Sequence, residues 1–140
     1  MEIYTDGACR GNGTENAKAS WGFVVIENGT DVYSDCGFVK GKQTNNTGEL
    51  MAIYEAIYYA IEKEENSVLI YSDSRYCIDS LTIWNIEKKR KGEHKANYYL
   101  IKDILALMED LDVSFEWVKG HDNNYFNDIA DNLANNLLGI

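Results

Sequence analysis

The sequence has no proline, only two histidines and three cysteines among its 140 residues. Cys9, Cys36 and Cys77 are odd in number and far apart. That spacing argues against a disulfide framework and against a zinc cluster, so we expect reduced thiols in a cytoplasmic protein. Because proline is absent, no proline marks a boundary between domains, and neither a repeat nor a low-complexity stretch divides the chain.

Long apolar runs are also missing. No run approaches the roughly 18 apolar residues that a membrane span requires. The first residues, MEIYTDGACRG, lack the basic and apolar regions of a signal peptide. With 45% hydrophobic and 26% charged residues, the composition is that of a globular protein. We expect one domain over residues 1–140, monomeric and not associated with a membrane.

Basic residues are few, at 13 against 23 acidic ones, and the net charge of −10 argues by itself against a nucleic-acid partner. The average conceals a local reversal. Residues 88–95, KKRKGEHK, which we call the basic segment, carry five of the basic residues and one acid. On charge alone, a solvated loop and a phosphate-binding patch explain this segment equally well.

The first half of the chain favours an antiparallel start to an α/β fold. We expect strands at residues 2–6, 20–26 and 31–39, with a type I′ turn at Asn28-Gly29 between the last two. A helix capped by Asn45-Asn46-Thr47 should follow, because apolar residues recur at helical spacing until the charged EKEEN; these residues are Leu50, Ile53, Ile57 and Ile61.

The second half predicts a central strand at residues 68–71, whose apolar run is typical of a strand buried on both faces. We expect a helix from about Ser74 that runs through Trp84 into the basic segment, and another helix from near Asn97. A half-buried strand should then turn Val113, Phe115 and Trp117 inward. A last helix carries Ile129, Leu133 and Leu137.

Four acidic residues lie where these predicted elements begin or end: Asp6, Glu49, Asp73 and Asp131. Carboxylates are hard oxygen ligands that suit Mg²⁺ or Mn²⁺. Each acid also has a purely structural interpretation. Asp6 could form an Asx turn before Gly7, Glu49 could close a capping box with Asn46, Asp73 could be an N-cap, and Asp131 could face the dipole of a helix capped by Asn127. A histidine alone in a loop, such as His121, is usually just exposed.

The combination is more specific than its parts. The strings YTDGACRGNG, TNNTGELMA, YSDSRY, EWVKGH and NDIADNLA, in this order and at these separations, resemble type 1 ribonuclease H, of the bacterial type within the retroviral-like RNase H superfamily. The resemblance spans residues 1–138. It implies an α/β fold with a mixed five-stranded sheet flanked by helices, in which strands one to three are antiparallel and strands four and five are parallel to strand one.

The same resemblance implies an activity and its residues. The activity is endonucleolytic hydrolysis of the RNA strand of RNA/DNA hybrids, with two Mg²⁺ ions bound together with substrate (or Mn²⁺), leaving 5′-phosphate and 3′-hydroxyl ends. The implied catalytic residues are Asp6, Glu49, Asp73 and Asp131 as metal ligands, and His121 as a mobile helper in proton movement or product release. Arg75 stands where glutamine is common, and Asp122, which follows His121, is expected to change its titration.

Substrate contacts follow from the resemblance as well. Cys9, Asn12, Asn45, Asn46 and Glu49 are implied on the side that contacts RNA, where the 2′-hydroxyl distinguishes RNA from DNA. Lys42, Thr44 and Asn97 match positions that grip a phosphate of the DNA strand. The basic segment, with Lys88, Lys89, Arg90 and Lys91, resembles a shortened form of the basic protrusion that holds substrate in many bacterial members. With so few basic residues, we expect binding to weaken only slightly with salt.

Two other classes of function stay open. A catalytically weak or inactive hybrid-binding module of the same fold would bind without cutting, and would normally lack at least one of the four acids. An acidic metal-binding or nucleic-acid-mimicking protein would present its carboxylates as a continuous surface. Because all four acids are present and lie in separate motifs, the sequence favours the enzyme.

Overall fold

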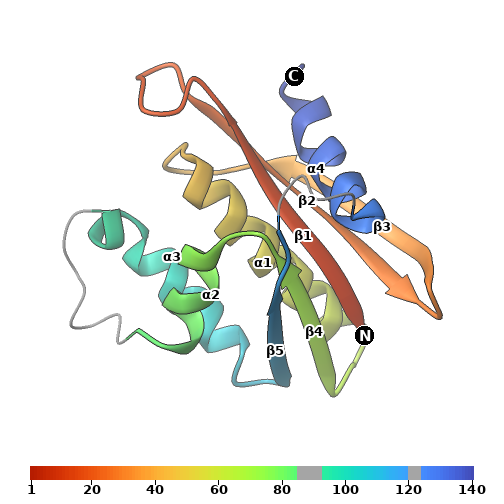
Figure 1. Cartoon of the computed structure of the whole chain (residues 1–140). Helices are drawn as coiled ribbons and strands as arrows, with labels where there is room; N and C mark the ends of the chain where they lie inside the picture. Colours follow the sequence, from red (N-terminus) through yellow and green to blue (C-terminus); the bar gives the residue numbers. More distant parts are fainter. Residues whose placement is uncertain (85–92, 120–123) are drawn as a thin grey trace.

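The computed structural model describes residues 1–84, 93–119 and 124–140, with the backbone alone for residues 93–96. Within these residues the chain forms one five-stranded sheet in the order β3-β2-β1-β4-β5 (Figure 1). The strands are β1 (Glu2–Arg10), β2 (Lys18–Glu27), β3 (Thr30–Phe38), β4 (Ser67–Ser72) and β5 (Asp112–Trp117). β1, β2 and β3 pair antiparallel, whereas β4 pairs parallel with both β1 and β5. The predicted α/β class and mixed sheet are confirmed.

The hairpin between β2 and β3 turns at Asn28 and Gly29, as predicted. Both residues have positive φ, 52° and 76°, which a type I′ turn requires. The end of β1 was predicted wrongly, because the strand continues to Arg10, opposite Lys18 of β2. The expected turn residues Asp6 and Gly7 therefore lie inside the strand, since pairing with β2 outweighs the local turn preference of Asp-Gly.

The described residues form four helices: α1 (Asn45–Glu62), α2 (Arg75–Thr82), α3 (Glu93–Leu107) and α4 (Tyr125–Leu137). In Figure 1, α1 crosses one face of the sheet with α2 and α3 beside it, and α4 lies on the opposite face. α2 ends before Trp84, earlier than predicted, and α3 begins four residues before Asn97. No helix within the described ranges is both long and apolar enough to cross a membrane.

α1 packs its predicted apolar face into the core, where Leu50, Ile53 and Ile57 are fully buried. Its N-cap is Thr44, one residue before the predicted cap. The Thr44 side chain accepts a hydrogen bond from the Thr47 backbone N–H, and the Thr47 hydroxyl accepts one from the Thr44 N–H. Glu49 is therefore not needed in a capping box, and its carboxylate is available for another role.

α4 lies close to the sheet because small residues face each other. A Cβ at Gly22 of β2 would lie 2.8 Å from the Ala130 carbonyl oxygen, and Ala130 and Ala134 are fully buried. The apolar residues predicted to face inward on this helix, Ile129, Leu133 and Leu137, are only half-buried, because the alanines take the closest positions. The N-cap is Asn124 and not Asn127.

Candidate metal centre and active site

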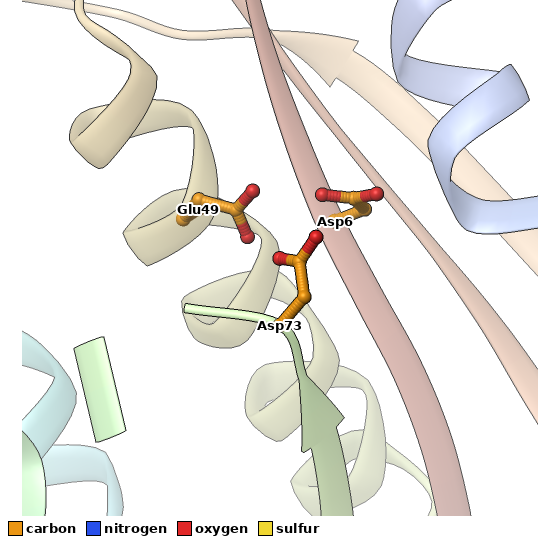
Figure 2. A group of neighbouring side chains, drawn as sticks. All are labelled: Asp6, Glu49 and Asp73. Atoms are coloured by element: carbon orange, nitrogen blue, oxygen red, sulfur yellow. The ribbon is translucent and has the colours of Figure 1, made fainter. Parts of the chain in front are cut away.

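Three of the four predicted acids converge at the carboxyl end of β4. Asp6 projects from the middle of β1, Glu49 from the start of α1, and Asp73 from the residue directly after β4 (Figure 2). One carboxylate oxygen from each residue lies within 4.8 Å of the others. Carboxylates from three separate elements thus face one another, an arrangement suited to a divalent cation.

Strand pairing and close helix packing produce this convergence. β1 pairs with β4 only as far as Tyr4 opposite Tyr71, yet β1 continues to Arg10. Beside this continuing part of β1, α1 approaches closely at Gly7. A Cβ there would overlap the backbone of Gly48 and Glu49. A Cβ at Gly48 would lie 2.8 Å from the Ser20 carbonyl oxygen of β2 and 3.2 Å from the Ala8 backbone of β1. Gly7, which the sequence places in a possible turn after Asp6, therefore allows the helix to approach the strand, and this approach brings Glu49 to Asp6.

Replacing Gly7 with alanine should separate α1 from β1. The added methyl would overlap backbone, which cannot move aside as a flexible side chain can, so we expect the free energy of unfolding to fall by about 3 kcal/mol. Gly13→Ala is the control, because no atom lies within 4 Å of its added Cβ and its cost is limited to about 1 kcal/mol of positive-φ strain. Urea unfolding measures both, and equal losses would show that the close contact is unimportant.

The structural interpretations of the acids can be tested against their contacts. Asp6 Oδ1 accepts a hydrogen bond from the adjacent Gly7 N–H at 2.9 Å, which is not the contact of an Asx turn. Asp73 is not a helix cap, because the N-cap of α2 is Ser74, whose hydroxyl accepts from Cys77 N–H at 3.1 Å. Neither structural interpretation accounts for the position of the carboxylates of Asp6 and Asp73, which face the centre (Figure 2).

Burial makes the charged forms of the clustered carboxylates unfavourable and so raises their pKa values. Desolvation, reinforced by the charges of Asp73 and Asp131 and opposed by a hydrogen bond with Glu49, raises the pKa of Asp6 to about 7. Burial, followed by the charge of Asp6, raises the pKa of Glu49 well above its usual value. Without a cation the two carboxyl groups favour a shared proton at neutral pH, because two adjacent buried carboxylates repel.

Asp131 lies at the edge of this group. It projects from the second turn of α4, one turn later than predicted, and its Oδ1 accepts a hydrogen bond from the Asn135 side-chain amide at 3.1 Å. Its charge raises the pKa of Asp6, which places it near the centre, although it is not one of the three acids whose oxygens lie within 4.8 Å. His121 lies outside the described residues.

The donor set fits a hard divalent cation. Glu49 Oε2 is buried and finds no hydrogen-bond partner among the described residues. A buried carboxylate oxygen without a partner is costly, and a cation held by the three carboxylates would remove that cost. Oxygen-only ligands suit Mg²⁺ or Mn²⁺, and none of the three free cysteines contributes an atom to the group.

A hollow of about 370 Å³ lies beside α1, between it and α3. Its lining includes two residues predicted to grip a phosphate, Lys42 and Asn97, together with Lys40. Asn97 is 2% exposed and donates its side-chain amide to the Tyr76 hydroxyl at 3.0 Å. Sequence reasoning did not identify Lys40, although its place two residues before Lys42 in an acidic chain was a usable signal.

A second hollow, of about 380 Å³, brings together most of the residues predicted to contact RNA; it is lined by Asn12, Gly13, Lys42, Thr44, Asn45 and Asn46. The Asn45 backbone N–H donates to Asn12 Oδ1 at 3.1 Å, which joins the β1–β2 loop to the start of α1. Cys9 is half-buried, with its thiol 3.9 Å from the Gln43 carbonyl oxygen. The basic residues Lys88, Lys89, Arg90 and Lys91 lie outside the described residues.

Comparisons with known proteins agree with this arrangement. The sequence model of the RNase H family matches residues 1–138. The chain is 35% identical to a ribonuclease H of Clostridium botulinum, strain Hall, over 97% of this chain and 93% of that protein. It is also 35% identical to a ribonuclease H of Legionella pneumophila, strain Corby, over 100% of this chain and 96% of that protein.

A solved structure supports the fold independently. The crystal structure of RNase H1 from the archaeon Halobacterium salinarum superposes with a TM-score of 0.77 at 24% identity, covering 99% of this chain and 96% of that one. The family match over nearly the whole chain, the two bacterial relatives and the shared fold all agree, and the chain belongs to the RNase H family.

Proposed function

We propose that this protein is an endonuclease that hydrolyses the RNA strand of RNA/DNA hybrids and leaves 5′-phosphate and 3′-hydroxyl ends. The observation that carries the proposal is the meeting of Asp6, Glu49 and Asp73, whose carboxylate oxygens lie within 4.8 Å of one another in a chain of the RNase H family. Among its relatives in fold, LC11-RNase H1 has been crystallised in complex with an RNA/DNA hybrid.

The three converging acids and Asp131 would hold the divalent ions. When bound, two such ions supply the Lewis acidity that activates water and stabilises the leaving 3′ oxygen. Asp6 and Glu49, whose pKa values are raised by burial, give up their shared proton when cations enter. Asp6 lies on strand β1 and Glu49 on helix α1. These two packed elements fix the positions of both carboxylates before substrate binds. We assign proton movement or product release to His121.

Recognition of the hybrid is assigned to the two hollows at the N-terminal half of α1. Amide and backbone groups of Asn12, Asn45 and Asn46 can bind 2′-hydroxyls across the wide minor groove of a hybrid. The 2′-hydroxyl is the group that distinguishes an RNA strand from a DNA strand. Lys42 lines both hollows, and with Asn97 and the additional cation Lys40 it suits a phosphate of the DNA strand. The basic segment would add a further phosphate contact outside the described residues.

Replacing Lys42 with alanine should weaken hybrid binding without affecting the chemical step. Loss of one charge-assisted phosphate contact is expected to raise KM about 3- to 10-fold while kcat stays within about twofold. Lys63→Ala is the matched control, because Lys63 is the C-cap of α1, at the other end of the helix from Lys42, and lines neither hollow. Its ammonium lies over the Tyr59 ring, 5.6 Å from the centroid. Steady-state kinetics on a labelled hybrid measure both variants, and the same KM for Lys42→Ala and the control would remove Lys42 from the binding site.

The substrate class is tested with four labelled nucleic acids: RNA/DNA hybrid, double-stranded RNA, double-stranded DNA and single-stranded RNA, each with and without Mg²⁺. We expect cutting of the hybrid alone, only with metal, and products that a phosphatase and a 3′-end ligation assay identify as 5′-phosphate and 3′-hydroxyl ends. The alternative of an inactive hybrid-binding module predicts a gel shift of the hybrid without products. Cutting of double-stranded RNA at an equal rate would contradict the proposed specificity.

A further inference from the structure

Trp117 is the last residue of β5, and its side chain makes a hydrogen bond to a residue that follows the neighbouring strand β4. Its indole N–H donates a hydrogen bond to the backbone carbonyl of Asp73 at 3.1 Å. Trp117 was predicted to face inward with Val113 and Phe115, but it is 40% exposed because it stands at the strand's end. Its side chain is therefore only partly used for packing.

This bond fixes the segment that carries Asp73. β4 ends at Ser72, which pairs with Trp117, and the Val118 backbone N–H donates to the Ser72 carbonyl at 2.9 Å. Beyond Ser72 the sheet pairing stops, so the peptide of Asp73 depends on other contacts for its orientation. The indole N–H provides one from the neighbouring strand, directly at the residue whose carboxylate meets Asp6 and Glu49.

The guanidinium of Arg75 stacks on the indole of Trp117. Arg75 is the first residue of α2, and its guanidinium carbon lies 4.5 Å from the centroid of the Trp117 ring. A cation stacked on an indole face restricts the rotation of an exposed tryptophan and so keeps its N–H directed at the carbonyl. Arg75, Trp117 and Asp73 thus form a chain of contacts that starts at solvent and ends at the acidic centre.

We propose that Trp117 is a positioning residue for the metal centre: its indole N–H, held by the stacked Arg75, fixes the Asp73 peptide so that the carboxylate stays in the group of three. The inference rests on the proposed function, because it concerns how tightly the acids hold a cation. Groups that orient metal ligands through hydrogen bonds contribute to metal affinity without touching the metal.

The test compares wild type with Trp117→Phe, which keeps an aromatic ring under Arg75 but has no N–H. Trp84→Phe is the matched control, since its ring packs edge-on against Tyr76. Calorimetric titration with Mn²⁺ alone should show about fivefold weaker binding for Trp117→Phe and unchanged binding for the control. The Mg²⁺ concentration at half-maximal cleavage should rise by a similar factor, whereas KM for hybrid at saturating metal should not change.

Several results would overturn the inference. Equal Mn²⁺ affinity of wild type and Trp117→Phe would do so. A raised hybrid KM with unchanged metal affinity would also do so, because it would make Trp117 a substrate contact.

If Trp117→Phe does not fold, Arg75→Ala is used. This variant keeps the indole N–H but removes the stacked guanidinium, and it should weaken Mn²⁺ binding about twofold. Failure of the wild type to bind Mn²⁺ would contradict both the inference and the proposed function, whereas failure of the variant effect alone would contradict only the inference.

Discussion

Replacing Asp73 with asparagine is expected to reduce cleavage of the RNA strand by at least about 10³-fold while the protein remains folded. Asparagine has nearly the same shape and keeps a carbonyl oxygen, but it has no charge to bind a divalent cation. Asp73 lies in the group of three and raises the pKa of both Asp6 and Glu49, so it contributes directly to the field at the centre. The loss should appear in kcat and should not be restored by more substrate.

The same substitution should stabilise the metal-free protein slightly. Removing the charge of Asp73 relieves repulsion on two buried carboxyl groups, so the melting temperature in a chelator should be unchanged or higher by a few degrees, about 2 to 4 °C per kcal/mol. Asp112→Asn is the matched control. Asp112 is exposed at the start of β5, whereas Asp73 lies beside the other end of that strand, where Ser72 pairs with Trp117. Normal turnover in Asp73→Asn would show that this carboxylate is not part of the catalytic centre.

The metal-free protein should become less stable as pH rises. The pKa of Asp6 is about 7 in the folded protein and near 3.8 when unfolded, so between these values the folded state binds more protons than the unfolded state. The free energy of unfolding should therefore fall by about 3 kcal/mol between about pH 5 and about pH 8 from Asp6 alone. Glu49, whose pKa is also raised, acts in the same direction.

Denaturant unfolding in a chelator at a series of pH values measures this dependence. Asp6→Asn is the control, because asparagine does not titrate and its curve should be flatter over the same range. Mg²⁺ should restore stability, and more strongly at the alkaline end, because metal and proton compete for the same carboxylates. Metal-free stability that is constant or increases from about pH 5 to about pH 8 would contradict the electrostatic description of the site.

Most helices and strands could be predicted from the sequence because each has a local signal, whereas the topology of the sheet was implied only by the resemblance to a known family. Asn28-Gly29 sets the hairpin, the apolar spacing from Leu50 to Ile57 sets α1, and residues 68–71 mark the central strand. The boundaries were less predictable, because they depend on partners. β1 extends to Arg10 only because β2 offers a partner as far as Lys18, and a single strand gives no sign of that.

The acids of the centre were identified from sequence, but the reason that they meet was not. From sequence, Gly7 is a possible turn residue after Asp6, whereas in the structure it allows close approach of the backbone of Gly48 and Glu49. This distinction requires the helix and the strand to be placed in space. The structural interpretations of Glu49 and Asp73 were also plausible from spacing, and only the caps at Thr44 and Ser74 exclude them.

Contacts between segments far apart in sequence had no sequence signal. The bond from Trp117 to the Asp73 carbonyl joins residues 44 positions apart, and alternation along β5 predicted an inward ring. Net charge was a poor guide to the binding of nucleic acid, because it averages over the chain. The two hollows at the N-terminal half of α1 place Lys40 and Lys42 together with amide groups. Local charge decides where a phosphate can bind, and local charge depends on the fold.

We propose that the carboxylates of Asp6, Glu49 and Asp73 hold divalent cations for cleavage of RNA paired with DNA; this is the role of the site. The most direct test of this role is the rate at which a 5′-labelled RNA strand in an RNA/DNA hybrid is cut as Mg²⁺ is titrated into chelator-treated protein, repeated with Mn²⁺. We predict no products without metal and a saturable increase in internal cleavage of the RNA strand as metal is added. Hybrid that remains uncut under both metals, or cleavage that persists unchanged in excess chelator, would contradict the account.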